Sequence, residues 1–105
     1  MDKYEFNIKV EQIKKLVNKG DYETAMKIAD TIDWRRVRSA NLLALVAEIY
    51  ENNEEYQEAK EVLLLAFERA PIGKRLLYKL ADLALKENNL REAEDYYREF
   101  CDLAP

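Results

Sequence analysis

The strongest constraint on the fold is a repeat of 34 residues that runs along the whole sequence. Three alanines, Ala25, Ala59 and Ala93, follow one another at this spacing. Other columns keep the same period, among them Ile28, Val62 and Tyr96, and Ile32, Ala66 and Phe100. A fixed period of this length is typical of arrays built from one stacked structural unit. We therefore treat the chain as three units rather than as one irregular globule.

Each unit contains two stretches with the apolar spacing of an amphipathic helix. Residues 40–52 carry apolar side chains three and four positions apart, and residues 56–69 restart the pattern after a polar turn at 53–55. The same plan predicts helices at 4–18 and 22–31, and at 74–86 and 90–103. Only two glycines and two prolines occur in 105 residues, which argues against turn-rich sheets. We predict an all-α fold of about six antiparallel helices, paired into three hairpins.

The first unit departs from the other two at its end. Pro71 and Pro105 end the second and third units, but Val37 stands near the corresponding place in the first. Residues 30–33 must therefore interrupt the helical pattern between the first two hairpins. We expect Asp33 to cap a helix that begins at Trp34 and is a turn longer than its counterparts. Trp34 should pack over the junction between the first two hairpins.

The composition offers little to an enzyme. The chain has no histidine, and two glycines cannot build a phosphate-binding loop. Cys101 is the only thiol, and we expect it on the apolar side of the last helix in a structural role, with a reactive thiol as the alternative. Acidic clusters near the second turn lack the ligand spacing of a calcium site. We predict no enzymatic activity, no cofactor and no metal.

Charge and hydropathy set further expectations. The 17 basic and 21 acidic residues give a net charge of −4, which argues against general nucleic-acid binding. One basic patch, residues 34–38, has a sequence that suits phosphate or an acidic peptide, although a structural role for Trp34 and Val37 is the simpler interpretation. No apolar stretch of 18 residues and no secretory leader is present. We expect a cytoplasmic protein without a membrane segment.

The period and its marker positions resemble the tetratricopeptide repeat (TPR), a helix-turn-helix with the pattern W-x2-L-G-x2-Y, then A-x3-F, then P. The second unit matches at Leu43, Val46, Ala47, Tyr50, Ala59, Leu63 and Pro71. The third matches at Leu77, Leu80, Ala81, Ala84, Ala93, Tyr97 and Pro105, whereas the first is degenerate. The resemblance implies a right-handed α-solenoid of three repeats, at about 6–38, 39–72 and 73–105, forming one domain over residues 1–105.

The resemblance also implies a function, that of a protein-protein interaction scaffold or adaptor. A partner protein or peptide segment would bind in the concave groove lined by the first helix of each repeat. Tyr78 is the expected apolar anchor, and Arg75 and Lys79 match one half of the carboxylate clamp that some family members use. The predicted groove positions are Asn7, Val10, Lys14, Asn18, Asn41, Ala44, Glu48, Asn52, Arg75, Tyr78, Lys79, Asp82 and Lys86.

The ends of the array suggest an alternative function. A stack of repeats needs a terminal helix with a polar outer face, because each hairpin leaves an apolar side for the next. The last predicted helix carries apolar residues instead, at Tyr97, Phe100, Cys101 and Leu103. We therefore expect either that the chain is the N-terminal part of a longer array or that this end forms a homo-oligomer. Structural self-association is the alternative to partner binding in the groove.

Overall fold

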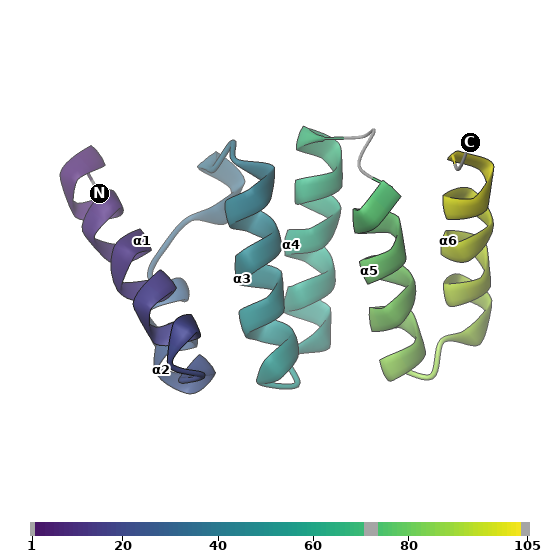
Figure 1. Cartoon of the computed structure of the whole chain (residues 1–105), viewed down its shortest axis with the longest axis horizontal. Helices are drawn as coiled ribbons and strands as arrows, with labels where there is room; N and C mark the ends of the chain where they lie inside the picture. The colour runs from purple at the N-terminus through teal and green to yellow at the C-terminus, as the bar shows by residue number, and fades with distance from the viewer. Residues whose placement is uncertain (1, 71–73, 104–105) are drawn as a thin grey trace.

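Six α-helices follow one another as three stacked hairpins in the computed structural model (Figure 1). The structure describes residues 2–70 and 74–103, apart from the side chains of residues 74, 75 and 103. The helices are α1 (Lys3–Asn18), α2 (Tyr22–Ala29), α3 (Ala40–Asn52), α4 (Tyr56–Arg69), α5 (Lys74–Lys86) and α6 (Leu90–Leu103). Within these residues no strand is present. The predicted all-α helical repeat array is therefore confirmed.

All three hairpins turn through the same backbone motif, which places one residue in the left-handed conformation. Gly20, Glu54 and Asn88 occupy this position with φ of 78°, 61° and 63°, and they are spaced by the 34-residue period. The next amide in each turn donates to the carbonyl five residues earlier, at 2.9, 2.9 and 2.8 Å. This pairing is the Schellman motif, which satisfies the last carbonyl groups of a helix. The turns predicted between the paired helices are thus confirmed.

A continuous strip of aliphatic side chains forms the core and runs from hairpin to hairpin. Its largest fully buried members are Ile13, Leu43, Val46, Ile49, Leu63 and Leu80. The alanines that first revealed the repeat are at most 1% exposed, so they lie where the helices approach most closely. Burying a large aliphatic side chain stabilises the fold by about 1.5–3 kcal/mol. Stability in this chain therefore comes from contacts within hairpins and between neighbouring hairpins.

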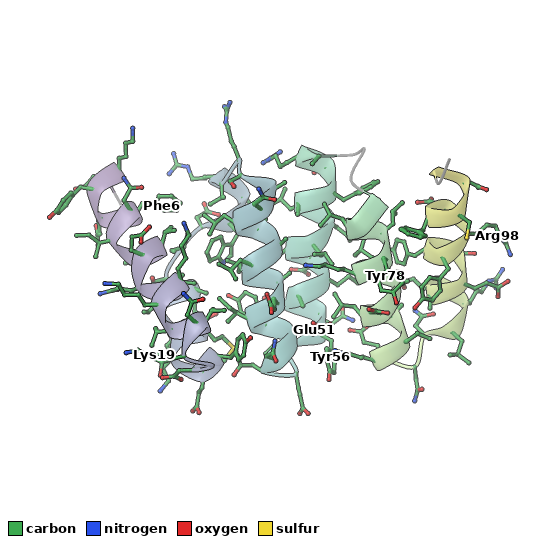
Figure 2. The ribbon with its side chains drawn as sticks, viewed as in Figure 1. Phe6, Lys19, Glu51, Tyr56, Tyr78 and Arg98 are labelled. Atoms are coloured by element: carbon green, nitrogen blue, oxygen red, sulfur yellow. The ribbon has the colours of Figure 1, made fainter. Side chains whose placement is uncertain are left out.

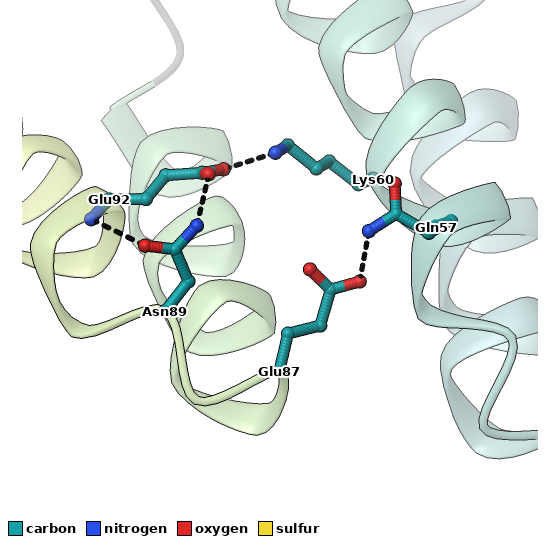
Figure 3. A network of polar contacts seen from close by, with 5 residues as sticks. All are labelled: Gln57, Lys60, Glu87, Asn89 and Glu92. Atoms are coloured by element: carbon teal, nitrogen blue, oxygen red, sulfur yellow. Dashed lines mark hydrogen bonds and ion pairs between the residues drawn. The ribbon is translucent and has the colours of Figure 1, made fainter.

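A polar network joins the second hairpin to the third (Figure 3). Lys60 on α4 forms an ion pair with Glu92 on α6. The Asn89 side chain accepts from the backbone N–H of Glu92 at 3.1 Å, which caps the start of α6, and its amide also donates to the Glu92 carboxylate at 2.8 Å. Gln57 donates to Glu87 at 2.7 Å. The hydrogen bond to Glu92 is the main reason that the pKa of Lys60 is raised.

The connector between the first two hairpins differs from the prediction. The expected helix from Trp34 into the second unit is wrong, because Trp34–Arg36 form only a 3₁₀ turn and α3 begins at Ala40. Between them Val37 is extended, with φ of −82° and ψ of 130°. This bend lets both Ile32 and Val37 enter the core, where each is 7% exposed. Helix α2 also ends at Ala29, two residues earlier than predicted.

Two caps in close succession explain why the connector does not form one helix. Asp33 does cap, as predicted, but it accepts from Arg35 at 3.2 Å and so starts only the short turn. Ser39 then accepts from the backbone of Leu42 at 3.2 Å and starts α3. Each capping side chain satisfies an amide that lacks a partner at a helix start. The indole of Trp34 is half-buried and packs against the core, as expected for the junction.

Candidate functional site

The helices α3 and α5 enclose a cleft of about 310 Å³. It contains four of the predicted groove positions, Ala44 and Glu48 on α3 and Lys79 and Asp82 on α5. Residues three or four positions apart lie on the same side of a helix, which is why each helix contributes a pair. The remaining lining residues are Ala47, Glu51, Leu63 and Leu83. The structure therefore brings the second-repeat and third-repeat parts of the predicted groove together.

Polar contacts organise the groove cleft, which is defined by these eight residues. Lys86 forms an ion pair with Glu51 at 3.1 Å between α5 and α3. Tyr97 on α6 donates to Asp82 at 3.0 Å, and burial together with this bond raises the pKa of the Tyr97 hydroxyl. Lys79 is half-buried and lies within salt-bridge distance of no carboxylate in the described part of the chain. Lys79 is thus a cleft cation without an ion-pair partner among the described residues, beside Glu51 and Asp82, whose carboxylates already have partners.

The other predicted groove positions are more scattered. Asn7, Lys14, Asn18, Asn41, Asn52 and Lys86 are exposed. Asn52 donates to the backbone carbonyl of Glu48 at 2.8 Å, and Lys14 approaches Glu11 at 3.8 Å. Val10 corrects the prediction: it is buried in the core at 9% exposure, so it presents little surface to a partner. Arg75 is also a predicted groove residue, and its side chain lies outside the described part of the structure.

Tyr78 belongs to an aromatic cluster and not to the lining of the groove cleft. Its ring centroid lies 5.8 Å from those of Tyr97 and Phe100, at interplanar angles of 70° and 60°. Tyr78 is still 47% exposed, and Figure 2 shows it on α5 on the side that faces α6. The predicted groove anchor and the predicted self-association end are therefore neighbouring parts of one surface.

The predicted self-association residues on α6 differ in how much of each is buried. Tyr97 and Phe100 are half-buried in the aromatic cluster. Cys101 is exposed, so the expectation that it lies on the apolar side of the last helix is wrong. It follows Phe100 by one residue, which turns its side chain about 100° around the helix, away from the cluster. Leu103 has a side chain outside the described residues.

The predicted basic patch is divided between two clefts. Arg36 and Arg38 line an opening of about 580 Å³ beside Phe6 near the start of α1. Arg35 lines a different cleft against α4. The arginines are exposed and point to separate surfaces, so the segment does not form one basic site.

Sequence reasoning missed half of the groove cleft. Glu51 and Leu83 each follow a predicted groove residue at helical spacing, which is a signal that could have found them. Leu63 comes from α4, a second helix of its repeat, and no rule about first helices would include it. No group of three possible metal ligands occurs among the described residues. In the same part of the chain, every helix is too short or too polar to cross a membrane.

Comparison with known proteins places the fold. Residues 40–72 and 74–105 match a family model described as a tetratricopeptide repeat. The translocator chaperone SycD of the Yersinia enterocolitica type III secretion system superposes with a TM-score of 0.74 at 16% identity, over 92% of this chain and 72% of SycD. The crystal structure of MamA superposes with a TM-score of 0.77 at 17% identity, and the aligned region spans 92% of this chain and 57% of MamA.

A third solved structure was determined with a ligand. It is the second TPR domain of Spaghetti (RPAP3) bound to the HSP90 peptide SRMEEVD. The TM-score is 0.74 at 18% identity, over 91% of this chain and 89% of that one. At these identities the likeness concerns the fold. Among curated proteins, none matches the sequence significantly.

Proposed function

This chain belongs to the tetratricopeptide repeat family, and from that premise we propose that it is a non-catalytic scaffold that docks a partner segment in the groove cleft between α3 and α5. Proteins of this fold generally mediate protein-protein interactions, and one structural neighbour holds a peptide. Fold alone does not assign a function, so the proposal must depend on the site. The partner is another protein or a peptide segment of it.

The observation that carries the proposal is the state of Lys79. The residue is half-buried, lines the cleft and has no carboxylate within salt-bridge distance in the described part of the chain. A partly buried cation gains from a charge-assisted hydrogen bond to an acidic or carbonyl group of a partner. The small side chain of Ala44, which is partly exposed and lines the same cleft, leaves room for a segment to approach α3. An extended segment with an acidic group therefore fits this part of the groove.

Charge reversal tests the proposal. The double variant Arg75→Glu with Lys79→Glu should lose the proteins that the wild-type chain retains from its native lysate. The matched control is Arg91→Glu with Lys27→Glu, which reverses two exposed cations on α6 and α2. If the groove is the binding surface, the control retains the same partners. Equal retention of partners by both variants would show that the groove is not the binding surface.

A second candidate function is self-association through the aromatic cluster. Leu63, one period before Tyr97, is 2% exposed beneath the following repeat, whereas Tyr97 is only half-buried. Ala66, one period before Phe100, is fully buried as well. An apolar surface that is covered in one repeat and open in the next is suited to binding a second copy.

Substitutions at two residues distinguish the two candidate functions. Phe100→Glu changes the aromatic cluster without entering the groove cleft, and Lys79→Glu does the reverse. Sedimentation equilibrium should show a dimer that Phe100→Glu dissociates if self-association is the function. A monomer at all concentrations would exclude it and leave the groove as the functional surface.

A further inference from the structure

A cleft of about 470 Å³, separate from the groove, lies where the connector between the first two hairpins crosses α4. Ile32, Trp34, Val62 and Leu65 form its apolar lining. Leu64, at its edge, is 40% exposed, which makes it one of the few large aliphatic side chains left open to solvent. Ligand sites are typically concave, mostly apolar and of about 300–1,000 Å³. We call this opening the connector cleft.

The connector cleft exists because the first repeat departs from the helical pattern of the second. Helix α4 continues to Arg69, whereas α2, in the same register, ends at Ala29. The connector that replaces the missing helical turns is fastened to α4. Arg69 donates to the backbone carbonyls of Arg35 and Val37 at 3.1 and 3.4 Å. The cleft is therefore a built part of the fold.

The rim of the connector cleft is acidic. Asp33, Glu58, Glu61 and Glu68 line it, and Arg35 is the one basic residue among the lining residues. In the described part of the chain, none of these carboxylates lies within salt-bridge distance of a cation. Other glutamates of the chain, such as Glu51 and Glu92, do have such partners. Complementary charge gives a partner specificity and orientation, so this rim favours a cationic one.

One polar atom of the cleft wall also lacks a partner. The indole N–H of Trp34 is buried without a hydrogen-bond acceptor among the described residues. It lies near the Tyr50 hydroxyl and opposes part of the rise in the pKa of that group, but it does not reach hydrogen-bond geometry. Buried donors without acceptors are rare in folded proteins. This N–H has almost no surface open to solvent, so it stays inside the cleft wall, and a bound segment would be held by the apolar lining and the acidic rim.

We propose that the connector cleft binds a basic amphipathic peptide segment of another protein. Such a segment would place a large apolar side chain against Leu64 and Trp34. Its lysines or arginines would pair with Glu61 and Glu68 on α4. Nucleic acid does not fit, because its phosphates would meet the acidic rim. This site is distinct from the groove cleft, so the chain would engage two segments of different charge on separate surfaces.

The single tryptophan of the chain lies in this cleft, so its fluorescence reports on binding there. The probe is the synthetic peptide acetyl-Lys-Arg-Leu-Leu-Arg-Lys-amide, which contains no aromatic residue. Titrated into the full chain, it should give a saturable change in Trp34 emission. The double variant Glu61→Gln with Glu68→Gln should weaken binding by about tenfold or more. The matched control, Glu23→Gln with Glu99→Gln, removes two exposed carboxylates elsewhere and should bind as the wild type does.

Other outcomes overturn the proposal. One is the absence of a saturable change with the wild-type chain, and another is equal weakening in the rim variant and the control. A probe with both leucines replaced by serine must bind more weakly, because equal binding would show charge attraction without use of the cleft. A change in emission with protein concentration alone would show that a second copy fills the cleft. Lys79→Glu should leave probe binding unchanged, which keeps this test independent of the groove.

Discussion

The hydroxyl of Tyr50 on α3 donates a hydrogen bond of 2.7 Å to the carboxylate of Asp30, the residue that follows α2. Tyr50 is 5% exposed, and its bond joins the second repeat to the first across 20 residues of sequence. Other polar contacts between these two repeats are made by the Asn53 side chain, which donates to the carbonyl of Tyr22 at 3.0 Å, and by Arg69, which donates to the connector. The Tyr50 bond therefore lies at the junction where the repeat pattern is broken.

Replacing Tyr50 with phenylalanine should lower the stability of the chain. The substitution removes a hydrogen bond to a charged group, which is worth about 1.5–3 kcal/mol, and leaves the apolar ring in place. Asp30 is exposed and can turn to water, so no buried charge remains. Urea unfolding should show a lower midpoint with an unchanged slope. An unchanged midpoint would show that the bond contributes nothing to stability.

The same tyrosine should make stability fall in alkaline solution. Burial, and then the bond to Asp30, raise the pKa of Tyr50 in the folded chain above 10. The raised pKa favours the folded state fully below about pH 10, the unfolded pKa of a tyrosine. This contribution is lost as pH rises through the higher folded pKa. The melting temperature of the wild type should therefore fall more steeply above pH 10 than that of Tyr50→Phe, and parallel curves would contradict the assignment.

Glycine at position 54 should stabilise the chain. Glu54 has φ of 61°, a left-handed conformation that costs a residue with a side chain about 1–2 kcal/mol. Gly20 holds the same turn position in the first repeat without that cost. After the greater chain entropy of glycine is subtracted, Glu54→Gly should gain about 0.5–1 kcal/mol. Thermal melts should show a rise of several degrees, and the reverse change, Gly20→Ala, should lower the melting temperature.

Two neighbouring leucines provide a matched test of the core. Leu63 is 2% exposed and Leu64 is 40% exposed, although both belong to α4. Leu63→Ala should lower the free energy of unfolding by about 2–5 kcal/mol because it opens a cavity. Leu64→Ala should change the free energy of unfolding by no more than about 0.5–1 kcal/mol. Denaturant unfolding of the two variants measures the difference. Similar losses would mean that the face of α4 assigned to the core is wrong.

The ion pair between Lys60 and Glu92 should couple the second and third hairpins. Both side chains are about three-quarters buried, at 25% and 24% exposure, and Glu92 is further held by its bond to Asn89. A double-mutant cycle with Lys60→Met and Glu92→Gln should give a coupling free energy of about 0.5–1.5 kcal/mol. The pair Arg98 and Glu94, both about two-thirds exposed on one helix, is the control and should couple weakly.

The sequence predicts the repeats better than it predicts the breaks between them. The starts of the second helices and the turns before them follow the 34-residue period, so Gly20, Glu54 and Asn88 take one conformation despite their different side chains. The connector escaped prediction because Asp33 and Ser39 are both capable caps. Which of them starts the long helix depends on burying Val37, and that is a tertiary effect.

The candidate site divides in the same way. The resemblance to the tetratricopeptide repeat implied that Glu48 and Lys79 lie in one groove, and both residues line the cleft between α3 and α5. The resemblance did not anticipate that Tyr78 turns towards Tyr97 and Phe100, because that choice depends on how α6 packs against α5. The connector cleft has no sequence signal at all, since it depends on helical turns that the first repeat lacks.

Photo-crosslinking tests the central proposal, that the groove cleft binds a partner segment, most directly. A photoreactive amino acid is placed at position 48 in the cleft and, as a control, at position 23 on the exposed face of α2. Irradiation in native lysate should give a discrete adduct from position 48 only, and Lys79→Glu in the same chain should abolish it. Adducts of equal yield from both positions, or an adduct from position 48 that survives Lys79→Glu, would contradict the proposed function.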